Sequence, residues 1–382
     1  MPSFATDLSC ARCGLRYPRG EPKNLCDCGG PLLVEYDLAA IARSEDRDAI
    51  AGRVPTMWRY RELLPVEDPT HVVTLGEGMT PLVPAERLGR RIGLPDLLVK
   101  DDGLNPTGTF KARGASCGVS VARELGIREV ALPTAGNAGG AWACYGAVAE
   151  MSVHVAMPSD APEVNKWECR MFGADLTLVD GLISDAAAVV ARGVEEHGWF
   201  DVSTFKEPYR VEGKKTLGFE IAEQLGWQTP DAIVCPVGGG VGIVGIWLAL
   251  GQLLEVGWIR GKLPRLMVVQ AEGCAPIVRA FDEGKTEAEP WANARTAAPG
   301  LRVPKPFADF LILRAVRETE GAAVAVGEDD IRAAIGELAR EAGVLAAPEG
   351  AAALAGARRF RERGDLAAGE RVVLLNTGSA LK

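Results

Sequence analysis

A lysine that follows a turn-forming stretch is the side chain in this sequence best suited to covalent chemistry. Residues 105–114 read N-P-T-G-T-F-K-A-R-G, so turn formers give way to helix-compatible residues from Phe110 onward. Lys111 is therefore predicted in the first turn of a helix, where the positive end of the helix dipole lowers the pKa of a lysine. A lysine that loses its proton easily can form a Schiff base with a carbonyl cofactor. On local chemistry alone, a solvated lysine beside a turn is an equally good interpretation.

Two glycine-rich loops follow predicted strands. Residues 134–140 read T-A-G-N-A-G-G and come after an apolar strand at 130–133, while residues 238–242 read G-G-G-V-G and come after the strand at 232–237. Backbone N–H groups at such strand-to-helix turns bind anions, phosphate in particular. The second loop also satisfies a G-x-G-x-x-G fingerprint ending at Gly245, so a nicotinamide-dependent dehydrogenase is a remote alternative.

Four of the nine cysteines lie close together near the N-terminus, as Cys10-x-x-Cys13 and Cys26-x-Cys28. Two close-spaced thiol pairs are what a tetrahedral zinc site needs, so the spacing predicts a small zinc ribbon. The second pair is tighter than the usual C-x-x-C, which leaves a metal-free ribbon as the alternative. Residues 31–37 read as a strand that closes this module.

The elements that must position these groups alternate between apolar strands and helical segments from residue 119 onward, which predicts an α/β fold with parallel sheets. The 382 residues are enough for more than one domain, and the net charge of −9 argues against a nucleic-acid surface. We find no signal peptide and no apolar span long enough for a membrane, so we expect no membrane partner and a cytoplasmic location.

Residues 105–114 resemble the lysine segment of the fold-type II pyridoxal phosphate (PLP) enzymes, most closely that of the threonine synthases. Residues 75–82 (L-G-E-G-M-T-P-L), 207–216 (E-P-Y-R-V-E-G-K-K-T) and 377–382 (T-G-S-A-L-K) resemble further motifs of that family, in the same order. The resemblance implies an α/β fold of PLP fold-type II, with two parallel-sheet subdomains and the cofactor in the cleft between them. It also implies a homodimer.

The domain organisation predicted on this basis has two parts. Residues 1–37 form a zinc-ribbon-like module, and residues 38–382 form the PLP-dependent catalytic domain. Within that domain the smaller subdomain spans roughly 105–210, and the larger one takes the remainder.

The resemblance further implies roles for single residues. Lys111 would be the Schiff-base lysine and acid/base, Asn137 would hydrogen-bond the phenolic oxygen of PLP, and Thr377 would face its pyridine nitrogen. Arg210, with Lys166, would meet the phosphate of the substrate. The backbone that would hold the cofactor phosphate belongs to Gly238, Gly239, Gly240, Val241 and Gly242. The loop that would hold the substrate carboxylate comprises Thr134, Ala135, Gly136 and Ala138.

The reaction implied is that of a threonine synthase, which converts O-phosphohomoserine and water to L-threonine and phosphate. Three departures from the family pattern concern the substrate: Ala112 replaces an aspartate, Glu207 replaces an asparagine, and the G-G-G-V-G loop resembles that of dehydratases. The alternative is therefore a β-elimination or β-replacement enzyme, such as a threonine or serine ammonia-lyase. A catalytically idle PLP- or effector-binding protein is a more distant one.

Overall fold

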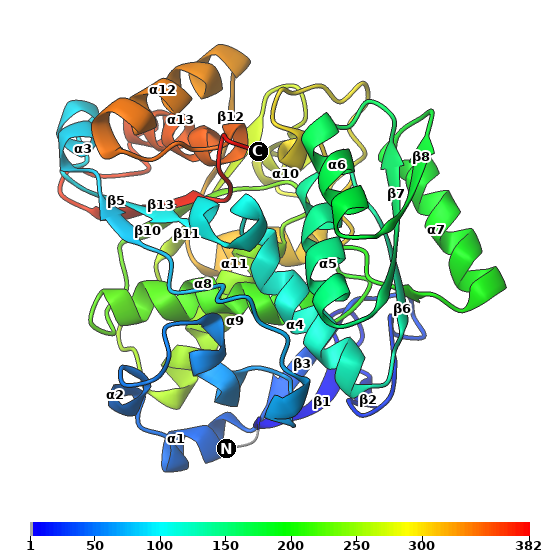
Figure 1. The fold of residues 1–382 in the computed structure, drawn as a ribbon. Helices are drawn as coiled ribbons and strands as arrows, with labels where there is room; N and C mark the ends of the chain where they lie inside the picture. The colour runs from blue at the N-terminus through cyan, green and yellow to red at the C-terminus, as the bar shows by residue number, and fades with distance from the viewer. Residues whose placement is uncertain (1–2) are drawn as a thin grey trace. The chain divides into compact units, whose positions relative to one another are not determined.

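The structure is a computed structural model that describes residues 3–382, in which the chain forms two compact units (Figure 1). Unit 1 is the described part of Met1–Gly78 together with Lys111–Thr216, and unit 2 is Met79–Phe110 together with Leu217–Lys382. The chain passes from one unit to the other between Phe110 and Lys111, so the predicted catalytic lysine is the first residue of its unit-1 segment. None of the helices within residues 3–382 combines the length and apolar character needed to cross a bilayer.

The first part of unit 1 is a three-stranded antiparallel sheet in the order β2-β1-β3. Its strands are β1 (Ala5–Cys10), β2 (Arg16–Pro18) and β3 (Leu32–Tyr36). Four short helical segments follow, namely α1 (Leu38–Ser44), α2 (Arg47–Ile50), η1 (Met57–Leu63) and η2 (Pro69–His71). The predicted strand at 31–37 is thus confirmed.

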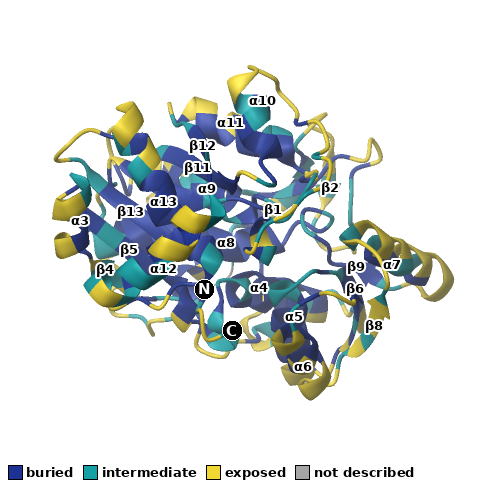
Figure 2. Cartoon of the chain, turned by 90° about the horizontal axis from the view of Figure 1, so that it is seen from above, coloured by how far each residue is buried: buried dark blue, intermediate teal, exposed yellow. Residues whose placement is uncertain are grey.

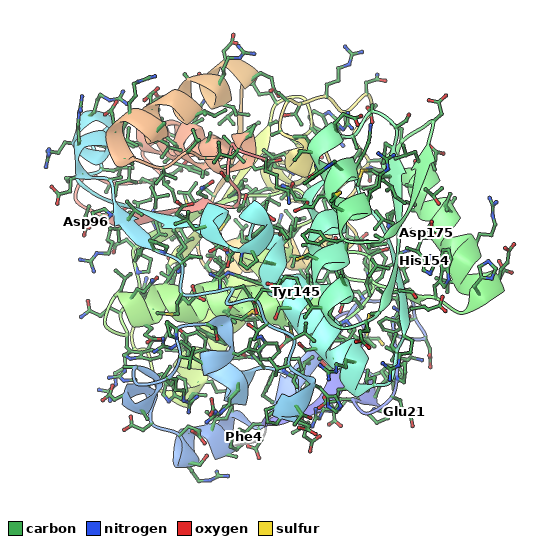
Figure 3. The ribbon with its side chains drawn as sticks, in the orientation of Figure 1. Phe4, Glu21, Asp96, Tyr145, His154 and Asp175 are labelled. Atoms are coloured by element: carbon green, nitrogen blue, oxygen red, sulfur yellow. The ribbon has the colours of Figure 1, made fainter. Side chains whose placement is uncertain are left out.

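The rest of unit 1 is built on a four-stranded parallel sheet in the order β8-β7-β6-β9. Its strands are β6 (Glu129–Pro133), β7 (Ser152–Pro158), β8 (Asp175–Val179) and β9 (Phe200–Asp201). Across three strands, the His154 ring lies 3.1 Å from Asp175 and 3.3 Å from Glu129 (Figure 3).

The helices of unit 1 begin where strands or turns end. They are α4 (Lys111–Glu124), α5 (Asn137–Val148), α6 (Glu163–Met171), α7 (Ile183–His197) and the first part of α8 (Arg210–Gln224). Helices α4 and α5 approach closely, because a β-carbon at Gly118 would lie 2.5 Å from the buried Trp142 ring. A glycine is needed at that crossing.

Unit 2 contains a six-stranded sheet in the order β12-β11-β10-β13-β5-β4, parallel except for the antiparallel edge strand β4. Its strands are β4 (Leu82–Pro84), β5 (Asp96–Asp101), β10 (Ala232–Pro236), β11 (Arg265–Ala271), β12 (Ala323–Val326) and β13 (Arg371–Asn376). The inner strands are mostly apolar and buried, as parallel strands covered by helices are, although β5 also carries the buried Lys100 (Figure 2).

The helices of unit 2 supply the cover for this sheet. They are α3 (Glu86–Ile92), the remainder of α8, α9 (Val241–Val256), α10 (Pro276–Asp282), α11 (Asp309–Glu318), α12 (Glu328–Ala342) and α13 (Pro348–Arg363). Short 3₁₀ turns lie at η3 (Asp102–Leu104), η4 (Pro106–Gly108) and η5 (Pro299–Leu301).

A fully buried ion pair joins Lys100, near the C-terminal end of β5, to Glu220 of α8. Lys100 Nζ lies 2.7 Å from Glu220 Oε2 and also donates to Thr80 O and Gln224 Oε1. These bonds use all three protons of the ammonium group, which is what a buried charge requires. The strand that leads to the 105–114 turn is therefore held firmly within unit 2.

Candidate active site

Two of the predicted cofactor residues of unit 1 are the first residues of helices. Lys111 opens α4 and Asn137 opens α5, both half-buried. Before α5, the Thr134 hydroxyl exchanges hydrogen bonds with the backbone of Gly136, at 3.0 Å to its nitrogen and 3.1 Å to its oxygen. No side chain caps the α5 N-terminus, and the first N–H groups of a helix have no acceptor within it. The loop therefore presents backbone donors, as an anion site needs.

Helix α6 lies against this loop through glycines. A β-carbon at Gly140 would lie 1.7 Å from Glu168 Oε2, and one at Gly136 would lie 3.2 Å from Asn165 Nδ2. Lys166 is buried on the same helix, and its ammonium group donates to Ser159 O and to Glu163 Oε1, each at 2.6 Å. Within the described residues, the Lys166 ammonium group thus binds acceptors at the N-terminal end of α6.

Arg210 is the first residue of α8 and is buried. Its guanidinium donates to Val202 O and to Thr204 Oγ1 (3.1 Å), and it stacks 5.3 Å from the Trp142 ring centroid. A β-carbon at Gly114 would lie 2.8 Å from Arg210 Cγ. Arg210 therefore packs on the first turn of α4, three residues from Lys111.

Glu207 caps the same helix. Its carboxylate accepts from the backbone nitrogens of Tyr209 (2.7 Å) and Arg210 (3.0 Å), and it lies 3.6 Å from Arg210 Nε. Burial raises the pKa of Glu207 to about 7, and burial also lowers the pKa of Arg210, so their mutual attraction recovers only part of the cost of desolvation. The family resemblance predicts an asparagine at 207; here the Glu207 carboxylate is engaged by the N-terminus of α8.

The predicted phosphate loop of unit 2 needs its glycines. Gly240 precedes α9 with φ +82°, and a β-carbon at Gly238 would lie 2.0 Å from Gly300 O in η5. Among the described residues, no side-chain hydrogen bond caps the N-terminus of α9, a helix of sixteen residues. Its first N–H groups therefore have no acceptor within the helix. This cradle fits a phosphate group.

The second cofactor segment of unit 2 meets the residue just before the lysine. Phe110 N donates to Thr377 O at 3.0 Å, and a β-carbon at Gly242 would lie 3.1 Å from the Phe110 ring. Thr377 is almost fully buried, and the neighbouring Asn376 donates to Asp101 Oδ1 at 2.7 Å. Phe110 thus contacts both predicted cofactor segments of its unit, and Lys111 is bonded to Phe110.

The four N-terminal cysteines converge as predicted. Their sulfur atoms all lie within 4.8 Å of one another, with Cys10 and Cys28 at 3.5 Å and Cys13 and Cys26 at 3.5 Å. Four thiolates around zinc would stand about 3.8 Å apart, given Zn–S bonds of about 2.3 Å in a tetrahedron. The Tyr17 hydroxyl donates to Cys26 at 3.3 Å and lowers the pKa of that thiol to about 6. The donor set fits one zinc ion.

Comparison with known proteins agrees with this geometry. The family described as "Pyridoxal-phosphate dependent enzyme" matches residues 73–378. The chain belongs to this family. Within it, the chain is 38% identical to the threonine synthase of Methanosarcina acetivorans over 377 residues, which cover 98% of this chain and 92% of that protein. It is 35% identical to the threonine synthase of Methanocaldococcus jannaschii over 374 residues, with the same two coverages. The predicted membership of the threonine synthases among the PLP enzymes is confirmed.

Solved structures support the fold. The processed form of threonine deaminase isoform 2 from Solanum lycopersicum superimposes with a TM-score of 0.68 at 25% identity, covering 88% of this chain and 90% of that one. Maize serine racemase gives a TM-score of 0.66 at 22% identity, over 79% of this chain and 90% of the racemase. The predicted α/β architecture of PLP fold-type II, with its small N-terminal sheet and four-cysteine cluster, is confirmed.

Sequence reasoning missed two buried polar side chains near these segments. Asn165 is 4% exposed, and its Oδ1 has no hydrogen-bond partner among residues 3–382. Glu77 is fully buried, although its motif reads only as a turn of glycine and proline before a strand. The signal available in the sequence was the carboxylate of Glu77, which stands between two glycines in an otherwise apolar segment.

The raised pKa of Glu207 predicts a pH-dependent stability difference. Below about pH 4.5 the group is protonated in both the folded and the unfolded chain, so its full contribution is present. That contribution should be lost as pH rises to about 7, by up to about 3 kcal/mol for a shift of this size. Urea unfolding of wild type and Glu207→Gln between pH 4 and 8 should show that the free energy of unfolding of wild type falls relative to that of the variant across that window and nowhere else. Glu196→Gln, an exposed carboxylate on α7, controls for loss of charge. A difference that is flat with pH would contradict the assignment.

Proposed function

We propose that this protein converts O-phosphohomoserine and water to L-threonine and phosphate. The observation that carries the proposal is the likeness to threonine synthases over 98% of the chain. The placement of Lys111 at the start of α4, with Arg210 packed on the same turn, is consistent with it.

Lys111 would hold the cofactor covalently in this proposal, and its amine would move protons at the carbon atoms of the substrate. The reaction needs protons taken from Cα and Cβ, so that the γ-phosphate can leave, and protons returned to Cγ and Cα, while water adds its hydroxyl group at Cβ and releases its other proton. When bound, PLP supplies an electron sink for the charge that develops at Cα. A lysine at a helix N-terminus is suited to this shuttling, because the dipole favours its neutral form.

Residues from both units then divide the binding tasks. Residues 238–242 hold the cofactor phosphate at the N-terminus of α9, and Asn137 donates to the phenolic oxygen. Thr377 offers a neutral hydroxyl to the ring nitrogen, which moderates the electron sink and suits elimination followed by addition.

The substrate is recognised at its two anionic ends. Backbone N–H groups of residues 134–138 hold the carboxylate, and Arg210, with Lys166, meets the phosphate. Arg210 spends one N–H on Val202 and one on Thr204, and its Nε faces Glu207 at 3.6 Å, which leaves the second N–H of each terminal nitrogen for a ligand. Because Glu207 caps α8, it neutralises Arg210 only in part and does not by itself exclude a phosphate from this site.

A second candidate function is a threonine or serine ammonia-lyase. Two observations favour it: the G-G-G-V-G sequence of residues 238–242, and the superposition on a threonine deaminase at 25% identity. Incubation with O-phosphohomoserine should release threonine and phosphate in equal amounts. Ammonia and a 2-oxo acid released from serine or threonine, with O-phosphohomoserine left intact, would select the lyase.

We further infer a cytoplasmic homodimer with one zinc ion per chain, and a division into residues 1–37, a smaller subdomain of roughly 105–210 and a larger one. The closed set of four thiolates leaves no coordination position for water, so the zinc would support local folding and take no part in the reaction.

Lys111 should carry the cofactor. Borohydride reduction of the purified protein, followed by peptide mass spectrometry, should place a pyridoxyl group on Lys111. Lys111→Ala and Lys111→Arg should both reduce turnover by at least about a thousandfold, because neither side chain can form the covalent bond or shuttle protons at neutral pH. A label on another lysine would overturn the assignment.

Arg210 should discriminate between phosphorylated and plain substrates. Losing a charged hydrogen bond to phosphate costs about 1.5–3 kcal/mol, so Arg210→Ala should raise KM for O-phosphohomoserine roughly 10- to 150-fold. The KM for an unphosphorylated hydroxy amino acid should change far less. Arg192→Ala, an exposed arginine on α7, is the matched control. Equal changes for both substrates would argue that Arg210 only supports the fold.

Zinc content can be measured directly. Protein purified without chelators should contain one zinc per chain by elemental analysis, and Cys13→Ser should lower both the zinc content and the melting temperature. Cys144→Ala, outside the cluster, should retain the metal. Protein that folds without bound zinc would contradict this part of the proposal.

A further inference from the structure

Glu77 is a buried carboxylate in unit 1 to which none of the roles above is assigned. It is 0% exposed, and five donor groups converge on its two oxygens. Oxygen Oε1 accepts from Thr74 Oγ1 (3.0 Å), Trp58 Nε1 (3.2 Å) and Ser116 Oγ (2.6 Å), whose single proton also has Val73 O as an acceptor at 2.8 Å. Oxygen Oε2 accepts from Leu75 N (2.9 Å) and the Tyr145 hydroxyl (2.6 Å).

All five of these partners are neutral, so the buried carboxylate is held directly by hydrogen bonds from uncharged groups. A carboxylate has about four lone-pair positions and no proton to donate, which matches a pocket made only of donors. A glutamine would fit the space but not the chemistry. In either orientation its NH₂ group would face an N–H donor, that of Leu75 on one side or of Trp58 on the other.

Two of the donors stand on the helices that carry predicted cofactor residues. Ser116 lies on α4, five residues after Lys111, and Tyr145 lies on α5, eight residues after Asn137 (Figure 3). At 1.5 Å per residue these are about 7 and 12 Å along rigid helices. A single carboxylate therefore joins the two helices at a short distance from their functional ends.

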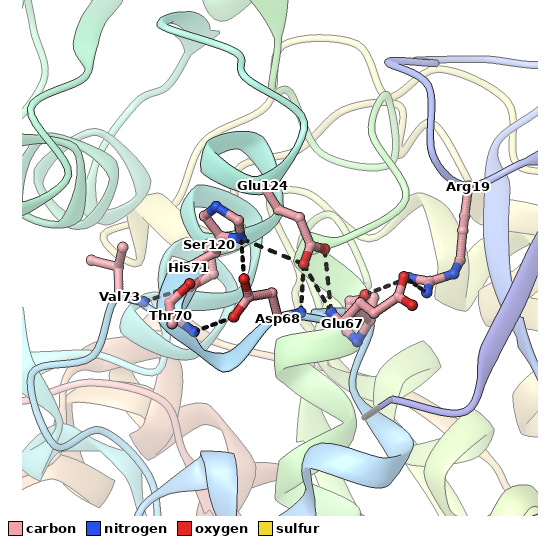
Figure 4. A network of polar contacts seen from close by, with 9 residues as sticks. Arg19, Glu67, Asp68, Thr70, His71, Val73, Ser120 and Glu124 are labelled. Atoms are coloured by element: carbon pink, nitrogen blue, oxygen red, sulfur yellow. Dashed lines mark hydrogen bonds and ion pairs between the residues drawn. The ribbon is translucent and has the colours of Figure 1, made fainter. Parts of the chain in front are cut away.

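The same segment follows α4 further along. Ser116, Ser120 and Glu124 are spaced four residues apart, so they share one face of the helix. Ser120 accepts from Val73 N at 2.8 Å, and Glu124 accepts from the backbone nitrogens of Glu67 and Asp68 (Figure 4). Three contacts along one face fix the rotation of α4 about its axis, and with it the direction of Lys111.

We propose that Glu77 is a positioning residue, which holds α4 and α5 in register so that Lys111 and Asn137 address the cofactor together. The inference rests on the proposed roles of those two residues. It assigns to the L-G-E-G-M-T-P-L motif a task in aligning the site, in addition to its task in the turn.

The test compares Glu77→Gln with Glu62→Gln in the PLP-loaded enzyme. Glu62 is an equally buried carboxylate of unit 1, bonded to Arg53 at 2.6 Å, and it contacts neither helix through the bonds described above. Melting temperature reports on stability in both variants. The pH midpoint of the cofactor absorption band and the separate values of kcat and KM report on alignment.

We expect Glu77→Gln to lower kcat at least about tenfold with KM changed less than about threefold, and to move the absorption midpoint by at least about half a pH unit. Glu62→Gln should lower the melting temperature but leave kcat and the midpoint unchanged. If Glu77→Gln does not fold, Tyr145→Phe and Ser116→Ala each remove one link and should each shift the midpoint. Wild-type midpoint and kcat in a folded Glu77→Gln, or in both single-link variants, would overturn the proposal, as would equal losses in the Glu62 control.

Failure of the proposed function itself would be visible separately, as a wild-type protein with no pyridoxyl label on Lys111. Hydrogen exchange on the cofactor-free protein then tests Glu77 alone. The amides in the first two turns of α4 and α5 should exchange faster in Glu77→Gln and at the wild-type rate in Glu62→Gln. Unchanged exchange in Glu77→Gln would reject the positioning role whatever reaction the enzyme performs.

Discussion

The backbone of Phe110 is the constraint on which the candidate site depends. Its N–H group is bound to Thr377 O, its ring lies against Gly242, and the peptide bond that follows it leads to Lys111. The bridge between Thr109 and Gly378 and the bond from Ser379 N to Gly108 O lock the same turn to the C-terminal strand end. Because Lys111 follows so constrained a residue, the position from which its side chain extends has little freedom. Covalent attachment of a cofactor requires this.

Helix N-termini supply most of the remaining chemistry. In unit 1, α4, α5 and α8 begin with Lys111, Asn137 and Arg210, and glycine contacts bring the first turns of α4 and α8 together. In unit 2, α9 begins directly after the glycine loop. Because each helix start carries partial positive charge and unused N–H groups, this arrangement favours anionic ligands before any side chain is counted.

Much of this arrangement could be predicted from the sequence because it is encoded locally. Turn formers before Phe110 placed the start of α4, and apolar runs placed the strands at 130–133 and 232–237. Strand β12, only four residues of alternating alanine and valine, escaped because so short a run carries no period. The surroundings of Glu77 and Arg210 could not be predicted, since their partners come from segments up to 96 residues away (Gly114 to Arg210) and only the tertiary fold brings them together.

The order of strands in the sheet of unit 2 has a consequence for how the protein matures. Strand β13 pairs with β5 on one side and β10 on the other, yet it comes after both of them in the chain (Figure 1). Until it is translated, β5 and β10 each have an unpaired edge, and the partner of Asp96 in register is Arg371. Pairing between strands that are far apart in the sequence makes folding slow. It also leaves unpaired, aggregation-prone strand edges exposed on the nascent chain. The turn that presents Lys111 is completed by the end of this same strand, so a growing chain would hold no finished cofactor site until β13 has been synthesised.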